Sequence, residues 1–95
     1  MIRVHTVLAV DGRCVDDLVV SINVDPIAGE FDEDNMPDYA TMALQEFLQR
    51  REINRDYYIA LGETMSQDNF FHSGRTVSIS SRVGDEAATA MMTLA

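Results

Sequence analysis

Apolar and polar side chains alternate along the first two dozen residues of this chain. The even positions of residues 2–10 are mostly β-branched or aliphatic, which predicts a β-strand with one buried face. Asp11-Gly12 follows, and this pair between two alternating runs is a strong signal for a hairpin turn. A second strand is expected within residues 13–24, where the even positions from 18 onward are apolar.

The two expected strands conflict in register. A two-residue turn pairs Val10 with Arg13 and Leu8 with Val15, which puts odd positions of the second strand on the buried face. Its apolar residues, however, stand at even positions. One inserted residue reverses every later side chain and restores the match. The sequence therefore predicts a β-bulge, or a longer irregular loop, around Asp16-Asp17.

The clearest helical pattern begins near Pro37. Residues 25–37 contain both prolines, a glycine and many acids without a regular period, so they are expected to form an exposed loop. Asp34 or Asn35 is suited to cap the following helix, and proline is favoured in a first helical turn. From there to about Ile53, apolar side chains recur every three to four residues, which predicts an amphipathic helix.

Three shorter patterns follow the helix. Residues 57–64 are apolar with an aromatic start and predict a third strand, whereas residues 66–74 are rich in turn formers. Residues 75–83 alternate between apolar and polar and predict a fourth strand. Residues 85–94 are rich in alanine and methionine, which favours a short C-terminal helix.

These elements give the order ββαββα and an α+β fold. A four-stranded antiparallel sheet with helices packed on one face would bury each alternating strand once. No linker divides the chain, so residues 1–95 are expected to form a single domain. The other face of the sheet is expected to carry Arg3, His5, Ser78, Ser80 and Arg82.

Charge restricts what the chain can do. Sixteen carboxylates face seven basic residues, all of them arginine, and the net charge is -9. Without lysine there is no Walker A phosphate loop, no Schiff base and no nuclease site that pairs acids with a lysine. The negative field repels phosphates and anionic lipids, so direct binding to nucleic acid or membrane is not expected. The same field attracts basic protein surfaces.

The compartment is expected to be the cytoplasm. Cys14 is the single cysteine, so an intramolecular disulfide cannot form. The N-terminus enters an alternating strand directly, without the pattern of a signal peptide. No segment approaches the roughly 18 apolar residues that a membrane span requires.

Metal-binding patterns fail when they are tested against known templates. His5, Cys14 and His72 lack the close pairing of zinc ligands. An EF-hand loop that began at Asp32 would have Ala43 where the final glutamate is required. No metal or cofactor is predicted, although a nonstandard divalent-cation site in the acidic segment stays open as an alternative.

Catalytic patterns are equally weak. His72 and Ser73 share a polar segment with Asp68, which suggests a hydrolytic triad. Sequence neighbours, however, rarely align a nucleophile, a base and an orienting acid. We therefore expect no enzymatic activity, and a small hydrolytic or metal-dependent enzyme is kept as an alternative.

The segment of residues 25–38 is the most acidic part of the chain and contains no basic side chain. In an extended segment alternate side chains lie roughly 7 Å apart, so its acids would form a line of negative charge. At least one ring of the Phe70-Phe71 pair is expected to be exposed, where it can stack on a cation. The expected partner-binding residues are Asp25, Glu30, Asp32, Glu33, Asp34, Asp38, Phe70 and Phe71.

In size, charge and missing chemistry, though in no motif, the chain resembles small acidic proteins with which phages and mobile elements block host nucleic-acid enzymes. Inhibitors of CRISPR and restriction systems belong to this group. The resemblance implies a non-enzymatic inhibitor that mimics nucleic acid and docks on a basic, nucleic-acid-binding protein. The alternative is a structural subunit or homodimer whose contacts are made by the apolar helix expected over residues 85–94.

Overall fold

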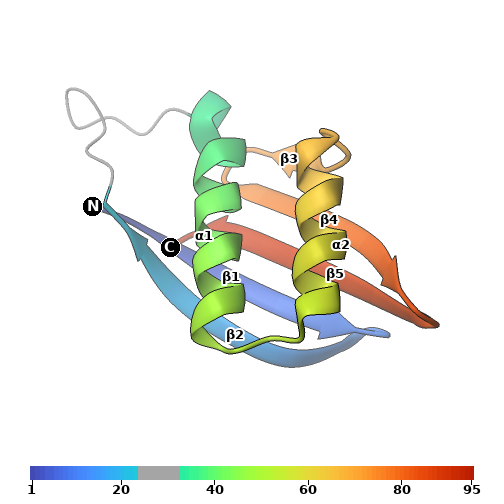
Figure 1. The fold of residues 1–95 in the computed structure, drawn as a ribbon. Coiled ribbons are helices and arrows are strands. Elements are labelled where there is room, and N and C mark those ends of the chain that lie inside the picture. Colours follow the sequence, from blue (N-terminus) through green and yellow to red (C-terminus); the bar gives the residue numbers. More distant parts are fainter. Residues whose placement is uncertain (24–32) are drawn as a thin grey trace.

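The computed structural model describes residues 1–23 and 33–95, in which a five-stranded antiparallel sheet is covered on one face by two α-helices (Figure 1). The elements are β1 (Ile2–Val10), β2 (Arg13–Ile22), a 3-10 turn (Glu33–Asn35), α1 (Met36–Arg50), α2 (Arg55–Ser66), β3 (Phe71–Ser73), β4 (Thr76–Val83) and β5 (Glu86–Leu94). The α+β class holds, but the predicted four-stranded sheet with ββαββα order is wrong: the described elements follow the order ββααβββ.

The first hairpin and its bulge are confirmed. Asp11 and Gly12 both have positive φ angles, of 51° and 80°, as a two-residue hairpin turn of the I′ type requires. The register shifts between Leu8, which pairs with Asp16, and Ala9, which pairs with Cys14. Val15 is therefore the inserted residue, directly before the predicted position. Beyond the bulge, the even positions of β2 face the helices, as the pattern required.

The strand order is β2-β1-β5-β4-β3, so β5 is the central strand of the sheet. The helix predicted over residues 85–94 is wrong. Gly84, with a φ of 62°, turns the chain between β4 and β5 and starts a hairpin. The alternate residues of β5 are then buried under the helices: Ala88, Ala90 and Met92. This packing outweighs the helix propensity of alanine and methionine.

Helix α1 lies where the sequence predicted it, but it ends at Arg50 and not near Ile53. Pro37 stands in its first turn, and Asn35 occupies the N-cap position without a capping hydrogen bond from its side chain. The end of the predicted acidic loop is therefore structured: Glu33 and Asp34 belong to the 3-10 turn, and Asp38 belongs to α1. Residues 24–32 lie outside the described structure.

The strand predicted over residues 57–64 is wrong, because this segment lies within α2. Asn54 caps the helix, since its side-chain oxygen accepts a hydrogen bond of 2.9 Å from the backbone N–H of Asp56. Leu61, Thr64 and Met65 are buried at helical spacing. The predicted loop after this segment contains a further short strand, β3.

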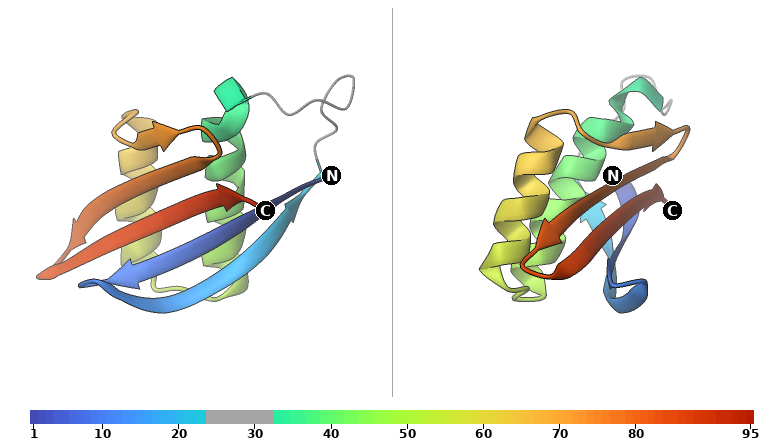
Figure 2. Two further views of the ribbon diagram at one scale, coloured as in Figure 1. Left: turned by 180° about the vertical axis from the view of Figure 1, so that it is seen from behind. Right: turned by 90° about the vertical axis from the view of Figure 1, so that its right-hand side faces the viewer.

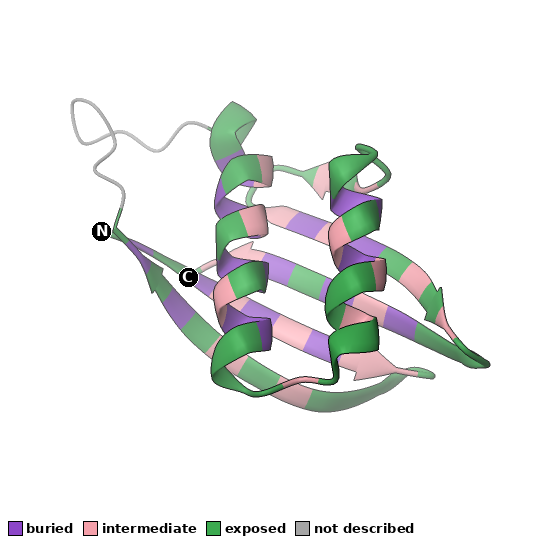
Figure 3. Cartoon of the chain, viewed as in Figure 1, coloured by how far each residue is buried: buried purple, intermediate pink, exposed green. Residues whose placement is uncertain are grey.

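The hydrophobic core lies between the helices and one face of the sheet, as the buried stripes in Figure 3 show. Figure 2 shows both helices on the same side of the sheet, and no described residue covers the opposite face. We call this opposite face the open face. Strand alternation and register place on it Arg3, His5, Val7, Ala9, Cys14, Asp17, Val19, Ser21, Phe71, Ser73, Thr76, Ser78, Ser80, Arg82, Ala87, Thr89, Met91 and Thr93. The predicted polar residues of this face are confirmed.

Candidate partner-binding groove

A groove with a volume of about 340 Å³ runs along α1 and α2, from Asp38 and Asp68 at one end to Leu48 and Tyr58 at the other. Its apolar lining comes from both helices and from the segment that follows α2. The carboxylates of Asp38 and Asp68 belong to its lining. The lining residues are Pro37, Asp38, Thr41, Leu44, Gln45, Leu48, Tyr58, Gly62, Met65, Ser66, Asp68 and Phe70.

A glycine in its lining keeps this groove open. Gly62 lies on α2, and a Cβ built there would meet no atom within 4 Å, so the space over this residue is empty. The hydroxyls of Thr41 and Ser66 donate to carbonyls of their own helices, those of Pro37 and Gly62, both at 2.9 Å. These hydroxyls are thus already partnered, which leaves the carboxylates as the strongest acceptors for an incoming cation.

The charge of the helix layer is divided between its two ends. Residues 14–49 contain no arginine, and neither do residues 56–74. The arginines of the helix layer, Arg50, Arg51 and Arg55, lie around the turn from α1 to α2, at the end away from Asp38 and Asp68. Neither Asp38 nor Asp68 has an ion-pair partner within the described ranges. Asp38 and Asp68 therefore present negative charge in the groove, and the nearest arginine in sequence to this end is Arg75, in the β3–β4 turn.

The structure brings some of the predicted binding residues together and separates others. Asp38 and Phe70 line the groove, and Glu33 approaches the β3–β4 turn beside it, with its Oε1 3.9 Å from a Cβ built on Gly74. Phe71 points to the open face and is 68% exposed. Asp25, Glu30 and Asp32 lie outside the described residues, and Asp34 lies in the exposed 3-10 turn.

The sequence interpretation missed the α2 side of the groove. Tyr58, Gly62, Met65 and Ser66 share one stripe of the helix, with the spacing i, i+4, i+7 and i+8. Once residues 55–66 are recognised as a helix, this spacing identifies the stripe. The strand predicted over residues 57–64 hides this stripe, because strand alternation puts neighbouring residues on opposite faces.

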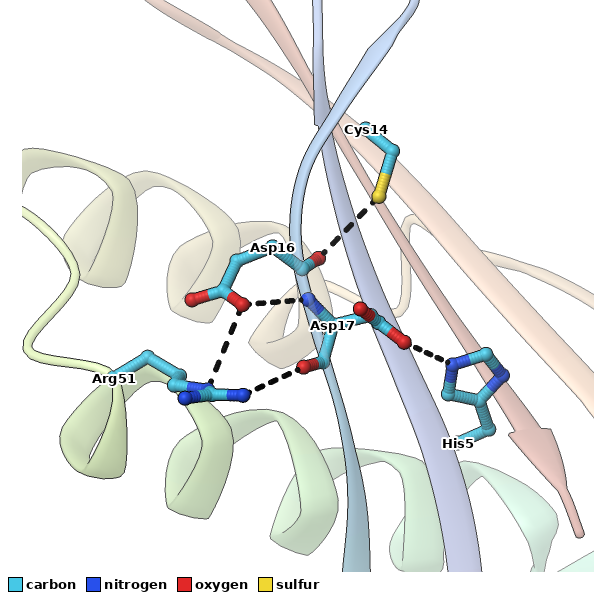
Figure 4. A network of polar contacts seen from close by, with 5 residues as sticks. All are labelled: His5, Cys14, Asp16, Asp17 and Arg51. Atoms are coloured by element: carbon cyan, nitrogen blue, oxygen red, sulfur yellow. Dashed lines mark hydrogen bonds and ion pairs between the residues drawn. The ribbon is translucent and has the colours of Figure 1, made fainter.

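A polar network ties the bulge of β2 to the end of α1 (Figure 4). Arg51 lies 3.5 Å from Oδ1 of Asp16 and donates to the backbone carbonyl of Asp17 at 3.2 Å. Asp16 and Asp17 point to opposite faces of the sheet, and Oδ2 of Asp17 lies 2.9 Å from Nε2 of His5 on the open face. Both carboxylates already have partners, so this network joins β2 to the end of α1 and offers no unpartnered carboxylate for binding.

A second acidic group gathers around Tyr57 at the other end of α2. The Tyr57 hydroxyl donates to Oε1 of Glu86 at 2.8 Å. This hydrogen bond, desolvation and the nearby charges of Glu86, Asp11 and Asp56 raise the pKa of Tyr57 above its ordinary value. The acids around Tyr57 thus lie at the opposite end of the helix layer from Asp38 and Asp68.

The residues of the hydrolytic alternative do not converge. His72 and Ser73 are neighbours in β3, so their side chains point to opposite faces of the sheet. Nε2 of His72 lies 2.8 Å from the backbone oxygen of Gly74. In the described parts of the chain, no three histidine, cysteine or acidic side chains gather as a metal site. None of the described helices is long and apolar enough to cross a membrane.

Comparisons with protein-family models, curated proteins and solved structures give no match for this chain. The groove and its charges are therefore the basis for the functional argument.

Proposed function

We propose that this protein is a non-enzymatic binding protein that docks its acidic groove end on a basic surface of another protein. The observation that supports the proposal is the groove between α1 and α2, in which an apolar lining adjoins the carboxylates of Asp38 and Asp68. This combination suits a long basic side chain, which has an aliphatic stem and a charged head.

An arginine of the partner fits the groove best. Its stem would pack on Leu44, Leu48 and Met65, while its guanidinium would donate to a carboxylate in the bidentate geometry that arginine favours. The rings of Phe70 and Tyr58 offer faces on which a guanidinium can stack. Burial of the stem supplies affinity, and the carboxylates speed association and select for positive charge.

The partner surface that we propose is one that otherwise holds nucleic acid. Such surfaces gather arginine and lysine to neutralise phosphates, so they are strongly basic. A bound acidic protein would compete with the nucleic acid and act as an inhibitor in the cytoplasm. The most specific form of this proposal is a phage anti-defence protein, such as an anti-CRISPR.

The test compares two double variants of equal net charge. Asp38→Asn with Asp68→Asn neutralises the groove, whereas Glu52→Gln with Asp85→Asn neutralises exposed residues away from it, and each changes the net charge from -9 to -7. Asp68 has a φ of 54°, a conformation that asparagine tolerates well. The probe is a short arginine-rich peptide, with its uncharged citrulline counterpart as a control.

We expect calorimetry at about 0.05 M salt to show binding of the arginine peptide and none of the citrulline peptide. The groove variant should lose roughly tenfold or more in affinity, and the control variant should stay within about twofold of the wild type. An equal loss in both variants would show that only net charge matters and would overturn the role of the groove. Proteins captured from lysate by the wild type alone are then tested for displacement by duplex DNA, which examines the competition with nucleic acid separately.

A further inference from the structure

The open face is a large surface that no described residue covers. Helices α1 and α2 both pack on the other side of the sheet (Figure 2). An antiparallel sheet commonly has one solvated face, and the residues of that face are then polar. Here the face carries several exposed apolar side chains. Phe71 is 68% exposed, Met91 is 46% exposed and Val19 is 39% exposed.

These apolar side chains form a band across the strands. Val7 pairs with Met91, Met91 pairs with Ser78, and Ser78 pairs with Phe71, so all four lie in one row of the sheet. On β2 the row ends at Asp17, which pairs with Val7, and Val19 stands two residues from it, next to His5. Most other positions on the face hold threonine, serine or alanine, which permit close approach of another surface.

The open face is also nearly free of the negative charge that dominates the chain. The chain has sixteen carboxylates, of which three lie in residues 24–32 and thirteen in the described structure. Among these thirteen, only Asp17 lies on the open face. Asp17 is paired with His5, and the face adds two arginines, Arg3 and Arg82. Two copies that met through any other broad surface would bring many carboxylates together, but through this face they would not.

The size of the face matches what a dimer needs. Four long strands at about 4.8 Å spacing, each of about eight residues at about 3.4 Å rise, give roughly 500 Å² per copy. Two copies would bury about 1,000 Å² before the area of the side chains and of β3 is added, which is about the minimum for a biological interface.

We infer that the open face binds a second copy of this chain, as a symmetric dimer with the two sheets face to face and the helices outside. A twofold axis that runs along β5 at Met91 exchanges the two flanks of the sheet. It therefore places Phe71 of the second copy over β2, at the level of Asp17 and two residues from Val19 of the first. Aligned sheets pack about 10 Å apart, which leaves room for these side chains to interdigitate. Both grooves stay accessible on the outer surfaces.

The test measures mass by sedimentation velocity from about 5 to about 500 µM protein. Met91→Glu places a charge at the centre of the proposed interface. Met42→Glu is the matched control, because Met42 is exposed to a similar extent, 43%, on α1 and does not line the groove. Phe71→Ser is the second variant, since Phe71 lies on the short edge strand, where a substitution disturbs the fold least.

The expected result is a dimer at high concentration for the wild type and Met42→Glu, and a monomer with unchanged far-UV circular dichroism for Met91→Glu. Phe71→Ser should weaken the dimer roughly tenfold or more, and it decides the question alone if Met91→Glu does not fold. A wild type that stays monomeric throughout overturns the inference, because the face is then covered by another partner or by water. A dimer that survives both substitutions also overturns it and points to a different contact, such as the outer edge of β2.

Discussion

Thr6 is a polar residue in the middle of the buried face of β1. It is fully buried, and its Oγ1 has no hydrogen-bond partner among the described residues. Its cross-strand neighbours on the two sides are Leu18 and Met92, both apolar. A buried hydroxyl without a partner loses its hydrogen bonds to water on folding, which costs about 1–3 kcal/mol.

Thr6→Val should therefore stabilise the protein, because it replaces the hydroxyl with a methyl group of similar shape. We expect a gain of about 1 kcal/mol, which corresponds to a rise in Tm of about 4–8 °C for a domain of this size. Thr64→Val is the matched control: Thr64 is also buried, but its hydroxyl donates to the carbonyl of Ala60 at 2.9 Å. Thermal unfolding that shows a lower Tm for Thr6→Val than for the wild type would contradict this reading.

At the scale of whole elements, the sequence predicts structure where the signal is local. The strands β1 and β2, the bulge between them, α1 and β4 follow from alternation, turn residues and helical spacing within short windows. The bulge is the clearest case, because Asp11-Gly12 and the even apolar positions of β2 cannot be reconciled without it.

The two misassigned elements show where local signals are insufficient. In residues 57–64, Tyr57, Ile59 and Leu61 fit a strand while Tyr57, Leu61 and Thr64 fit a helix, and eight residues are too few to separate the two periods. In β5, the small residues Ala88 and Ala90 are buried where both helices contact the strand. A helix propensity of a few tenths of a kcal/mol per residue is overridden by such packing.

Tyr57 links two elements that are distant in sequence, because its hydroxyl on α2 donates to Glu86 on β5. The pKa of Tyr57 is raised in the folded protein, so folding favours the protonated hydroxyl. This contribution is fully present below the ordinary tyrosine value of about 10 and is lost as the pH rises from there through the folded pKa. The link between α2 and the β4–β5 hairpin should therefore weaken only in alkaline solution.

Tyr57→Phe should be less stable than the wild type at neutral pH, and the difference should shrink or reverse by about pH 11. Urea unfolding at both pH values measures this difference in stability. Tyr58→Phe is the control, because Tyr58 is the next residue of α2 and its side chain lines the groove. A stability difference that stays constant between the two pH values would show that the hydrogen bond to Glu86 contributes nothing.

At the scale of the whole molecule, the candidate site was only half predictable. The acidic and aromatic composition pointed to Asp38 and Phe70, which do line the groove. The groove itself arises because α1 and α2 pack side by side over the sheet, and no local pattern encodes that contact. Phe70 and Phe71 illustrate the limit: strand geometry at β3 sends Phe71 to the open face, while Phe70 packs against the core.

The net charge of -9 also sets how the whole molecule responds to salt. The radius of gyration is 12.8 Å, so at about 0.02 M salt, where the Debye length is roughly 20 Å, all the carboxylates repel one another. Ion pairs such as Arg50–Glu46 are exposed and offset little of this repulsion. The folded chain holds its charges closer together than the unfolded chain does, so screening should favour the folded state.

We therefore expect Tm to rise by several degrees between about 0.02 M and about 0.5 M sodium chloride. The rise should be smaller in the Glu52→Gln, Asp85→Asn variant, which carries two fewer charges, and a Tm that falls with salt would contradict the argument. Binding of a basic partner must respond in the opposite direction, because the same screening weakens its attraction to the groove. Salt thus separates the two properties: the free protein is more stable at high salt than at low salt, so release of a partner at high salt cannot be attributed to unfolding.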